Sequence, residues 1–148
     1  MSAEHHATLV RRYFDDVLNG LNGPDPGRAL AIVDQLFADD FKMGFNNATD
    51  AEMAHGRAAH KAFLVDHARD YPDDHWIVEE LIAVDDAIAC QWHIRARHVE
   101  SGNPIDVRAA DFYRVRDGRL AELRRFLDFQ SFNRQKRRST AIRAHPAR

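Results

Sequence analysis

The spacing of apolar residues changes once along the chain, and this change constrains the fold more than any other feature. Before Pro72 the apolar residues recur every three or four positions, which is typical of amphipathic helices. After Pro72 they alternate with polar residues, which is typical of half-buried strands. Helices followed by consecutive strands favour an α+β fold, with the helices packed on one face of a curved antiparallel sheet.

The same patterns set the expected boundaries of the elements. We expect three helices, over residues 9–21, 28–37 and 57–70, and a short strand over 41–45. Four further strands are expected over residues 75–84, 87–98, 105–116 and 119–129. A curved sheet closed by helices leaves a cone-shaped apolar pocket, the default site for a small molecule.

Asp117-Gly118 is a strong signal for a two-residue hairpin turn, and such a turn fixes the register of the last two strands. Arg116 is then expected opposite Arg119, and Asp111 opposite Arg124. Residues directly opposite each other share a face of the sheet. One face of this hairpin would carry Val107, Ala109, Asp111, Arg124, Phe126 and Asp128, and the other Phe112, Leu123, Arg125 and Leu127. A bulge would exchange the two faces beyond it.

Two carboxylates in different surroundings can supply an acid and a base. A carboxylate near an arginine stays ionised, whereas an apolar setting raises its pKa. Asp111, Arg124 and Asp128 are therefore candidate catalytic residues, and a solvated ladder of surface charges is the alternative. In the preceding strand His98 ends the interior-facing row and is a further candidate acid or base, or else a plain surface residue.

Several other side chains are candidates for binding a substrate. Tyr13 is an aromatic of the first helix whose hydroxyl needs a partner and would reach the pocket. Asn46 follows the short strand and would donate to a substrate oxygen, although loop asparagines commonly serve turns. The predicted substrate-binding set is Tyr13, Phe45, Asn46, Trp76, Trp92 and Phe126.

The charge of the chain is unevenly distributed. The formal net charge is −2, but residues 133–148 contain basic side chains and no acidic ones, so the rest of the chain is acidic. We expect residues 1–132 to form a single domain and residues 133–148 a basic, solvated or flexible tail. The average composition does not favour nucleic-acid or membrane binding, and contact of the tail with nucleic acid ranks last among the alternatives.

The number of cysteines and the spacing of the histidines argue against disulfides and metal sites. Cys90 is the single cysteine, so we expect neither an intramolecular disulfide nor a multi-cysteine zinc site. His55, His60 and His67 lack the spacing of a known metal site, so no metal is expected. No segment is apolar over the length of a membrane span and the N-terminal segment is not a signal peptide, so we expect a cytoplasmic location.

Several segments between Leu9 and Gln135, taken in order, resemble the SnoaL-like polyketide cyclases of the nuclear-transport-factor-two-like superfamily. The segments are residues 36–41 (LFADDF), 56–57 (GR), 71–73 (YPD), 79–86 (EELIAVDD), 92–98 (WHIRARH) and 111–120 (DFYRVRDGRL), followed by Asp128, Phe132 and Gln135. The resemblance implies a cone-shaped α+β fold, a homodimer, and no metal or cofactor.

The resemblance also implies a function. In these cyclases an acidic residue on the last strand, here Asp128, is the acid/base of an aldol-type ring closure on a small hydrophobic carbonyl compound. The chain departs from the family pattern at Arg124, where a large aromatic is usual. Alternatives are a non-catalytic ligand-binding or dimerisation module, or isomerase, dehydratase or epoxide hydrolase-like chemistry. Phe45 stands where related isomerases place their base.

Overall fold

The computed structural model of the chain describes residues 2–143, with side chains as far as residue 137. The helices are α1 (Ala3–Arg12), which continues as the π-helix η1 (Tyr13–Leu18), α2 (Pro26–Leu36), the 3-10 turn η2 (Asp50–Glu52), α3 (Arg57–Asp70) and α4 (Phe129–Arg143). The strands are β1 (Phe37–Phe45), β2 (Ala54–His55), β3 (His75–Val84), β4 (Ala87–Arg97), β5 (Pro104–Arg116) and β6 (Arg119–Phe126).

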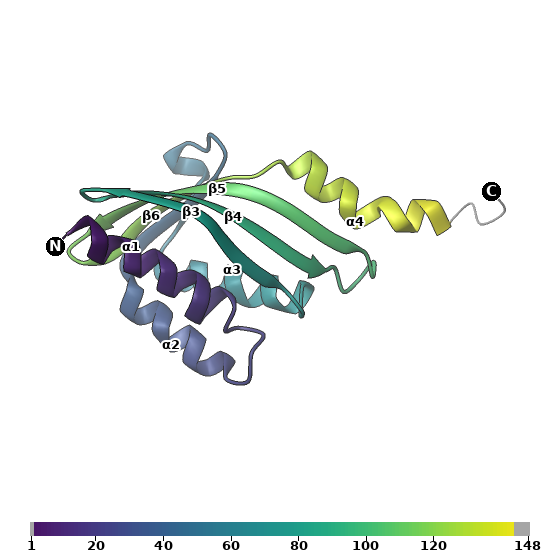
Figure 1. Cartoon of the computed structure of the whole chain (residues 1–148), viewed down its shortest axis with the longest axis horizontal. Coiled ribbons are helices and arrows are strands. Elements are labelled where there is room, and N and C mark those ends of the chain that lie inside the picture. The colour runs from purple at the N-terminus through teal and green to yellow at the C-terminus, as the bar shows by residue number, and fades with distance from the viewer. Residues whose placement is uncertain (1, 144–148) are drawn as a thin grey trace.

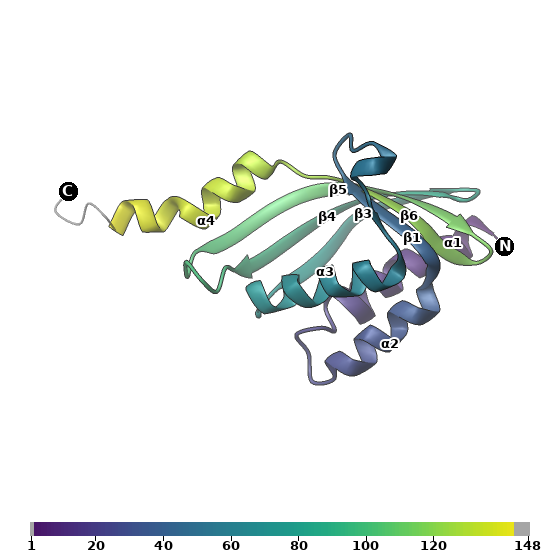
Figure 2. The same ribbon diagram turned by 180° about the vertical axis from the view of Figure 1, so that it is seen from behind.

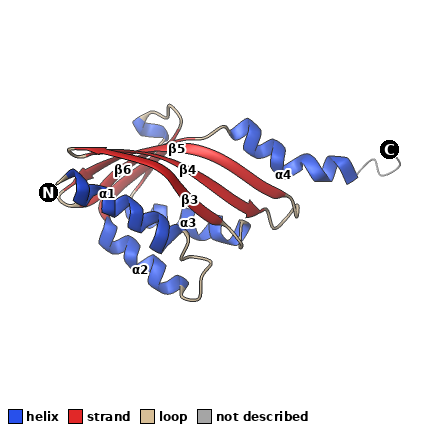
Figure 3. Ribbon diagram, viewed as in Figure 1, coloured by secondary structure: helices blue, strands red, loops and turns tan. Residues whose placement is uncertain are grey.

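The strands form one curved sheet in the order β2-β1-β6-β5-β4-β3. Helices α1, α2 and α3 lie on one side of this sheet, inside its curve, and the core fills the space between them (Figures 1 and 3). The predicted α+β class is confirmed. The sheet is antiparallel except between β1 and β6, which run parallel. Parallel neighbours need a long connection, and here all the other strands lie between them in the sequence.

Local sequence accounts for where the helices begin. Asp25 caps α2, because its carboxylate accepts a hydrogen bond from the Arg28 backbone N–H at 3.0 Å, and Pro26 occupies the first helical turn. The first helix does not end where its α-helical part ends, at Arg12. It widens into the π-helix at Tyr13, where the Asn19 N–H donates to the Phe14 carbonyl at 2.9 Å. Single π-helical turns are frequent at functional sites.

The β5–β6 hairpin has the predicted turn but not the predicted register along its whole length. Asp117 and Gly118 both have positive φ, and Arg116 pairs with Arg119 as expected. The register then shifts, since Val115 pairs with Leu120 while Arg114 pairs with Glu122. Ala121 is the extra residue of this bulge, and a bulge moves every later side chain of its strand to the other face.

The bulge corrects two predictions. Asp111 lies opposite Arg125 rather than Arg124, and Phe112 lies opposite Arg124. Arg125 therefore points into the interior with Asp111. Arg124 and Phe126 lie on the outer face with Phe112, whose ring packs edge-on against Phe126 at 5.6 Å.

The basic C-terminal segment is helical as far as the structure describes it. Where the sequence led us to expect a solvated tail, α4 runs from Phe129 to Arg143 and extends beyond the end of the sheet (Figure 2). Its first half is attached to the body, because the Gln135 side chain accepts from the Asp106 N–H at 2.8 Å and donates to the Asp106 carbonyl at 3.0 Å. Residues 144–148 lie outside the described part of the chain. Within residues 2–143, no helix is long and apolar enough to cross a membrane.

Candidate functional site

A buried ion pair lies at the centre of the sheet. Asp111 on β5 is 0% exposed and Arg125 on β6 is 3% exposed. The pair is bidentate, with Arg125 Nε donating to Asp111 Oδ1 at 2.8 Å and Nη2 donating to Oδ2 at 2.9 Å. The Tyr113 hydroxyl donates to Asp111 Oδ2 at 2.6 Å. The carboxylate is therefore fully occupied in holding Arg125, which is the usual condition for burying a charge.

The charge of Asp111 keeps Arg125 ionised. Burial alone would lower the pKa of the Arg125 guanidinium, but the charge of Asp111 and its hydrogen bonds outweigh burial and raise that pKa above its ordinary value. Burial, reinforced by the negative charge of Asp111, raises the pKa of the Tyr113 hydroxyl well above its usual range. Tyr113 is thus a neutral donor, and Arg125 remains a cation at any physiological pH.

Arg125 also forms the inner wall of a cavity. Its guanidinium carbon lies 4.8 Å from the centroid of the Trp92 ring and 5.4 Å from that of Trp76. We call the cavity at this point the aromatic cavity. It has a volume of about 230 Å³, and its aromatic lining includes Phe45, Phe63, Tyr71, Trp76, Trp92 and Phe132. Arg125 and His67 are the charged or titratable nitrogen groups in this lining, and no carboxylate belongs to it among the described residues.

His67 is held against a buried carboxylate. His67 Nδ1 on α3 lies 3.6 Å from Oδ2 of Asp74, whose side chain is only 3% exposed. Asp74 is itself fixed by the Trp76 indole N–H and the Asn22 amide, each donating at 2.9 Å. The His67 ring also packs against Tyr71 at 4.6 Å. The imidazole is therefore oriented, with Nδ1 toward Asp74.

A second histidine is buried deeper, against Tyr13. The Tyr13 hydroxyl and His60 Nε2 are 2.9 Å apart, and His60 Nδ1 has no hydrogen-bond partner in the described part of the chain. Burial, and then the positive charge of Arg125, lowers the pKa of His60 to about 3. His60 is consequently neutral, and Tyr13 is satisfied within the core by His60.

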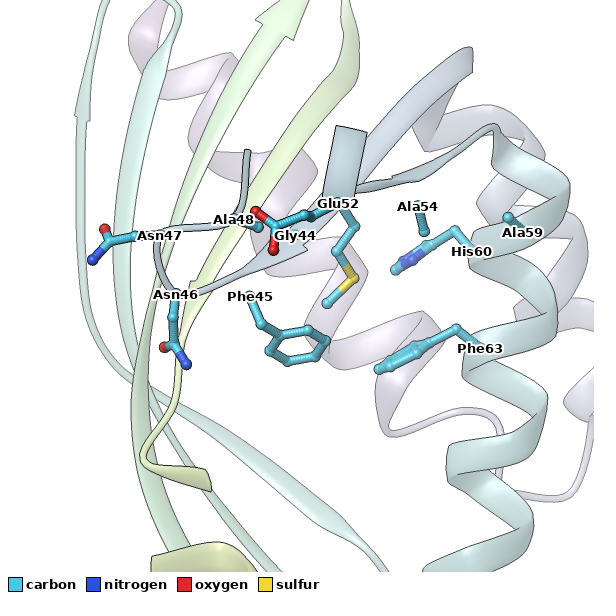
Figure 4. Close-up of a pocket in the computed structure, with 11 residues that line it drawn as sticks. Gly44, Phe45, Asn46, Asn47, Ala48, Glu52, Ala54, Ala59, His60 and Phe63 are labelled. Atoms are coloured by element: carbon cyan, nitrogen blue, oxygen red, sulfur yellow. The ribbon is translucent and has the colours of Figure 1, made fainter. Parts of the chain in front are cut away.

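A larger, more open hollow adjoins the aromatic cavity. It has a volume of about 600 Å³ and lies between the end of β1, the following loop and α3. Figure 4 shows Phe45 and Phe63 side by side at its base, with the Glu52 carboxylate and the amides of Asn46 and Asn47 around it. Phe45 and Phe63 line both spaces, with ring centroids 6.0 Å apart.

The structure distributes the predicted catalytic residues over several places. Asp128 is exposed and caps α4, because its Oδ1 accepts from the Ser131 N–H at 3.0 Å. It lies in the sequence between two residues of the cavity lining, Leu127 and Phe129, but is not one of the described lining residues itself. Its catalytic role stays a prediction. Arg124 donates to the Ala48 carbonyl at 3.1 Å, away from Asp111.

The remaining predicted residues also have defined positions. His98 Nδ1 is 2.9 Å from the Ser101 hydroxyl in the turn after β4. Asn46 joins strand ends, because its side-chain oxygen accepts from the Leu127 N–H at 3.0 Å. Trp76, Trp92 and Phe45 line the aromatic cavity. Phe126 lines a groove on the outer face instead, which corrects its predicted placement beside Asp111.

Sequence reasoning missed Arg125 and His67, although each left a signal. Leu120 and Leu123 are both fully buried at an odd spacing in one strand, which is the spacing that a bulge between two core residues produces. His60 and His67 share a helix face with Leu64, at intervals of four and three residues. Metal-site spacing alone does not reveal this shared inward face.

Comparisons with known proteins agree with this architecture. A family model described as the SnoaL-like domain matches residues 10–123. No curated protein matches the chain. Among solved structures, a candidate SnoaL-like polyketide cyclase from Jannaschia sp. CCS1 is 17% identical, with a TM-score of 0.77 over 90% of this chain and 92% of that one.

Two further solved structures are similar over nearly the whole chain. An LEH-like epoxide hydrolase from M. tuberculosis is 12% identical, with a TM-score of 0.72 over 97% of this chain and 98% of that one. IdmH, a candidate polyketide cyclase from Streptomyces antibioticus, is 20% identical, with a TM-score of 0.69 over 88% and 96%. At these identities the structures establish a shared fold, while the family match covers most of the sequence. The chain therefore belongs to the family of SnoaL-like domains.

Proposed function

We propose that the chain is an enzyme that uses only its own side chains for acid–base chemistry on a small hydrophobic carbonyl compound. The observation that carries this proposal is Arg125, a buried cation in the wall of a cavity that is otherwise mainly aromatic. Apolar cavities with a few convergent polar groups are the usual form of small-molecule sites. Similar SnoaL-like proteins described as candidate polyketide cyclases support the same class of chemistry.

The geometry gives Arg125 a specific part in this proposal. Asp111 engages Nε and Nη2 and leaves Nη1 outside the pair. The Trp92 indole N–H is buried without a partner in the described part of the chain, and Trp92 lines the same cavity, so this N–H is a candidate second donor. These donors suit a carbonyl oxygen, and they would stabilise the negative charge that develops on it when a neighbouring C–H loses its proton. Because Asp111 neutralises Arg125, a neutral ligand fits better than an anion.

The same geometry weighs against epoxide hydrolysis of the kind named for one structural neighbour. Asp111 is enclosed by three hydrogen bonds and no carboxylate lines the aromatic cavity within the described residues. A mechanism that needs a carboxylate to activate water therefore finds none there. Exchange of a proton next to a carbonyl group needs only a base and a donor to the oxygen.

The test is hydrogen–deuterium exchange in D2O, followed by NMR, on a panel of 1-tetralone, a cyclic 1,3-diketone and an aromatic β-keto ester. Wild-type protein should exchange the α-hydrogens of at least one of them faster than buffer does. The variant Asp111→Leu/Tyr113→Phe/Arg125→Met, which removes the whole polar cluster without leaving a charge, should lose this exchange. Binding without exchange by the wild type would instead support a non-catalytic ligand-binding module.

A further inference from the structure

We propose that His67, oriented by Asp74, is the group that carries the proton in the aromatic cavity. This inference rests on the proposed function and names the base that the function needs. His67 lines the same cavity as Arg125, and both lie against one ring, since the Trp76 centroid is 5.2 Å from the His67 ring and 5.4 Å from the Arg125 guanidinium carbon. A small ketone bound beside Trp76 would lie within reach of both groups.

The contacts of His67 are those of an oriented imidazole. Asp74 Oδ2 lies 3.6 Å from Nδ1, and Asp74 cannot swing away, because Asn22 and Trp76 hold both of its oxygens. Nε2, on the opposite edge of the ring, makes no hydrogen bond to the described residues. At 3.6 Å the two atoms lie within ion-pair distance but do not form a hydrogen bond, so the carboxylate stabilises an imidazolium at this position through its charge.

The other titratable groups are less suited to this part. His60 Nε2 is engaged by Tyr13, and its pKa of about 3 keeps it from accepting a proton at neutral pH. Asp111 is enclosed by Arg125 and Tyr113. Asp128 is exposed and its carboxylate caps α4. Among the residues that the structure describes, His67 alone combines a place in the cavity lining, a free nitrogen and a fixed carboxylate partner.

The proposed step is balanced without an oxidant or a reductant. Neutral His67 takes a proton at Nε2 from the carbon next to the carbonyl, and the C–H electron pair becomes the carbon–carbon double bond of an enolate. The negative charge moves to the oxygen beside Arg125 Nη1. The imidazolium, stabilised by Asp74, then returns its proton to carbon or to an oxygen of the product. Asp74 and Tyr71 are the titratable groups in contact with His67, and Arg125 lines the same cavity.

The experiment compares four variants by α-hydrogen exchange of 1-tetralone in D2O and by tetralone binding. His67→Asn keeps an amide near the Nδ1 position but cannot transfer a proton, so exchange should fall at least about 100-fold, the lower end for acid–base catalysis. Its Kd for tetralone should stay within threefold of wild type. Asp74→Asn should lower exchange about tenfold, because the imidazolium that forms during proton transfer loses its counter-charge.

Two controls make the result specific. His75→Asn replaces an exposed neighbouring histidine and should leave exchange unchanged. Asp128→Asn keeps the cap on α4 and tests the competing base. Retention of exchange within threefold by His67→Asn, or its loss in Asp128→Asn alone, would overturn the inference.

A second readout separates this inference from the proposed function. The imidazole ¹⁵N signals of His67 should shift when tetralone is added, and they should also differ between wild type and Asp74→Asn, because the ring loses its charged neighbour. If the wild type exchanges nothing, the proposed function fails, and these signals still decide the placement of His67. If the ¹⁵N signals of His67 change neither on addition of tetralone nor in Asp74→Asn, the inference about His67 is overturned.

Discussion

The buried pair of Asp111 and Arg125 gives the sharpest stability prediction. Asp111→Asn leaves the Arg125 cation buried without its counter-charge. Because both side chains are almost completely excluded from water, the loss should be about 3–5 kcal/mol, the range for removing one partner of a buried pair. That is a large part of the 5–15 kcal/mol that is typical for the stability of a whole domain.

Replacing Asp111, Tyr113 and Arg125 together by apolar residues should lower the free energy of unfolding far less than removing one charge of the pair. Tyr113 must be included, because its hydroxyl would lose the acceptor Asp111, which costs about 1–3 kcal/mol. The variant Asp111→Leu/Tyr113→Phe/Arg125→Met removes every charge and unpaired group together. Its stability should lie within about 2 kcal/mol of wild type, since apolar replacements of buried pairs are often neutral or stabilising. On this account the pair serves to present Arg125 to a ligand, and stability does not require it.

The assay is urea unfolding followed by circular dichroism and tryptophan fluorescence, with an exposed ion pair as matched control. Arg114 and Asp86 are 3.3 Å apart, and both side chains are about 60% exposed. Asp86→Asn should therefore cost less than about 1 kcal/mol. If Asp111→Asn cost no more than this control, or if the triple variant were as unstable as Asp111→Asn, the reasoning about the buried pair would be refuted.

Two further predictions concern other parts of the molecule. Folding lowers the pKa of His60 from its ordinary value to about 3. The contribution of His60 to the free energy of unfolding is therefore complete above about pH 6.5. Between pH 6.5 and pH 3 this contribution should fall by about 1.4 kcal/mol per pH unit. The stability difference between wild type and His60→Asn, measured by urea unfolding from pH 7 to 5, should shrink accordingly, and a constant difference would contradict a neutral buried imidazole. Phe112 is 51% exposed beside Ile82 and Val84 on the outer face, where we propose that two copies pack as a homodimer. Phe112→Glu should give monomers in sedimentation experiments, and a wild-type chain that is already monomeric would show this proposal to be wrong.

Much of the fold could be predicted because periodicity is a local property. The range predicted for the third helix, 57–70, and that for the strand over 75–84 agree with α3 and β3, since Tyr71-Pro72-Asp73 separates two clearly different periods. The Asp117-Gly118 turn was likewise readable, because both positions need positive φ. The parallel pairing of β1 with β6 had no local signal, since it depends on how distant elements pack.

The site was harder to predict because a single extra residue in β6 determines which side chains face the interior. The bulge at Ala121 decides whether Arg124 or Arg125 points inward, and alternation alone assigns the wrong arginine. His67 was also hidden, since Asp74 lies seven residues away and becomes its partner only when α3 ends and β3 turns back. Sequence patterns therefore made Asp111 a candidate, while the sheet face that lines the cavity and the partners of Asp111 and His67 required the three-dimensional structure.

The central claim is that Arg125 binds and polarises a carbonyl oxygen in the aromatic cavity. The most direct measurement is the carbonyl stretching frequency of ¹³C=O-labelled 1-tetralone bound to the protein, recorded by difference infrared spectroscopy. We expect a lower frequency in the wild-type complex than in water, and a return toward the value in an apolar solvent in Asp111→Leu/Tyr113→Phe/Arg125→Met. A bound carbonyl with the same frequency in both proteins would contradict it.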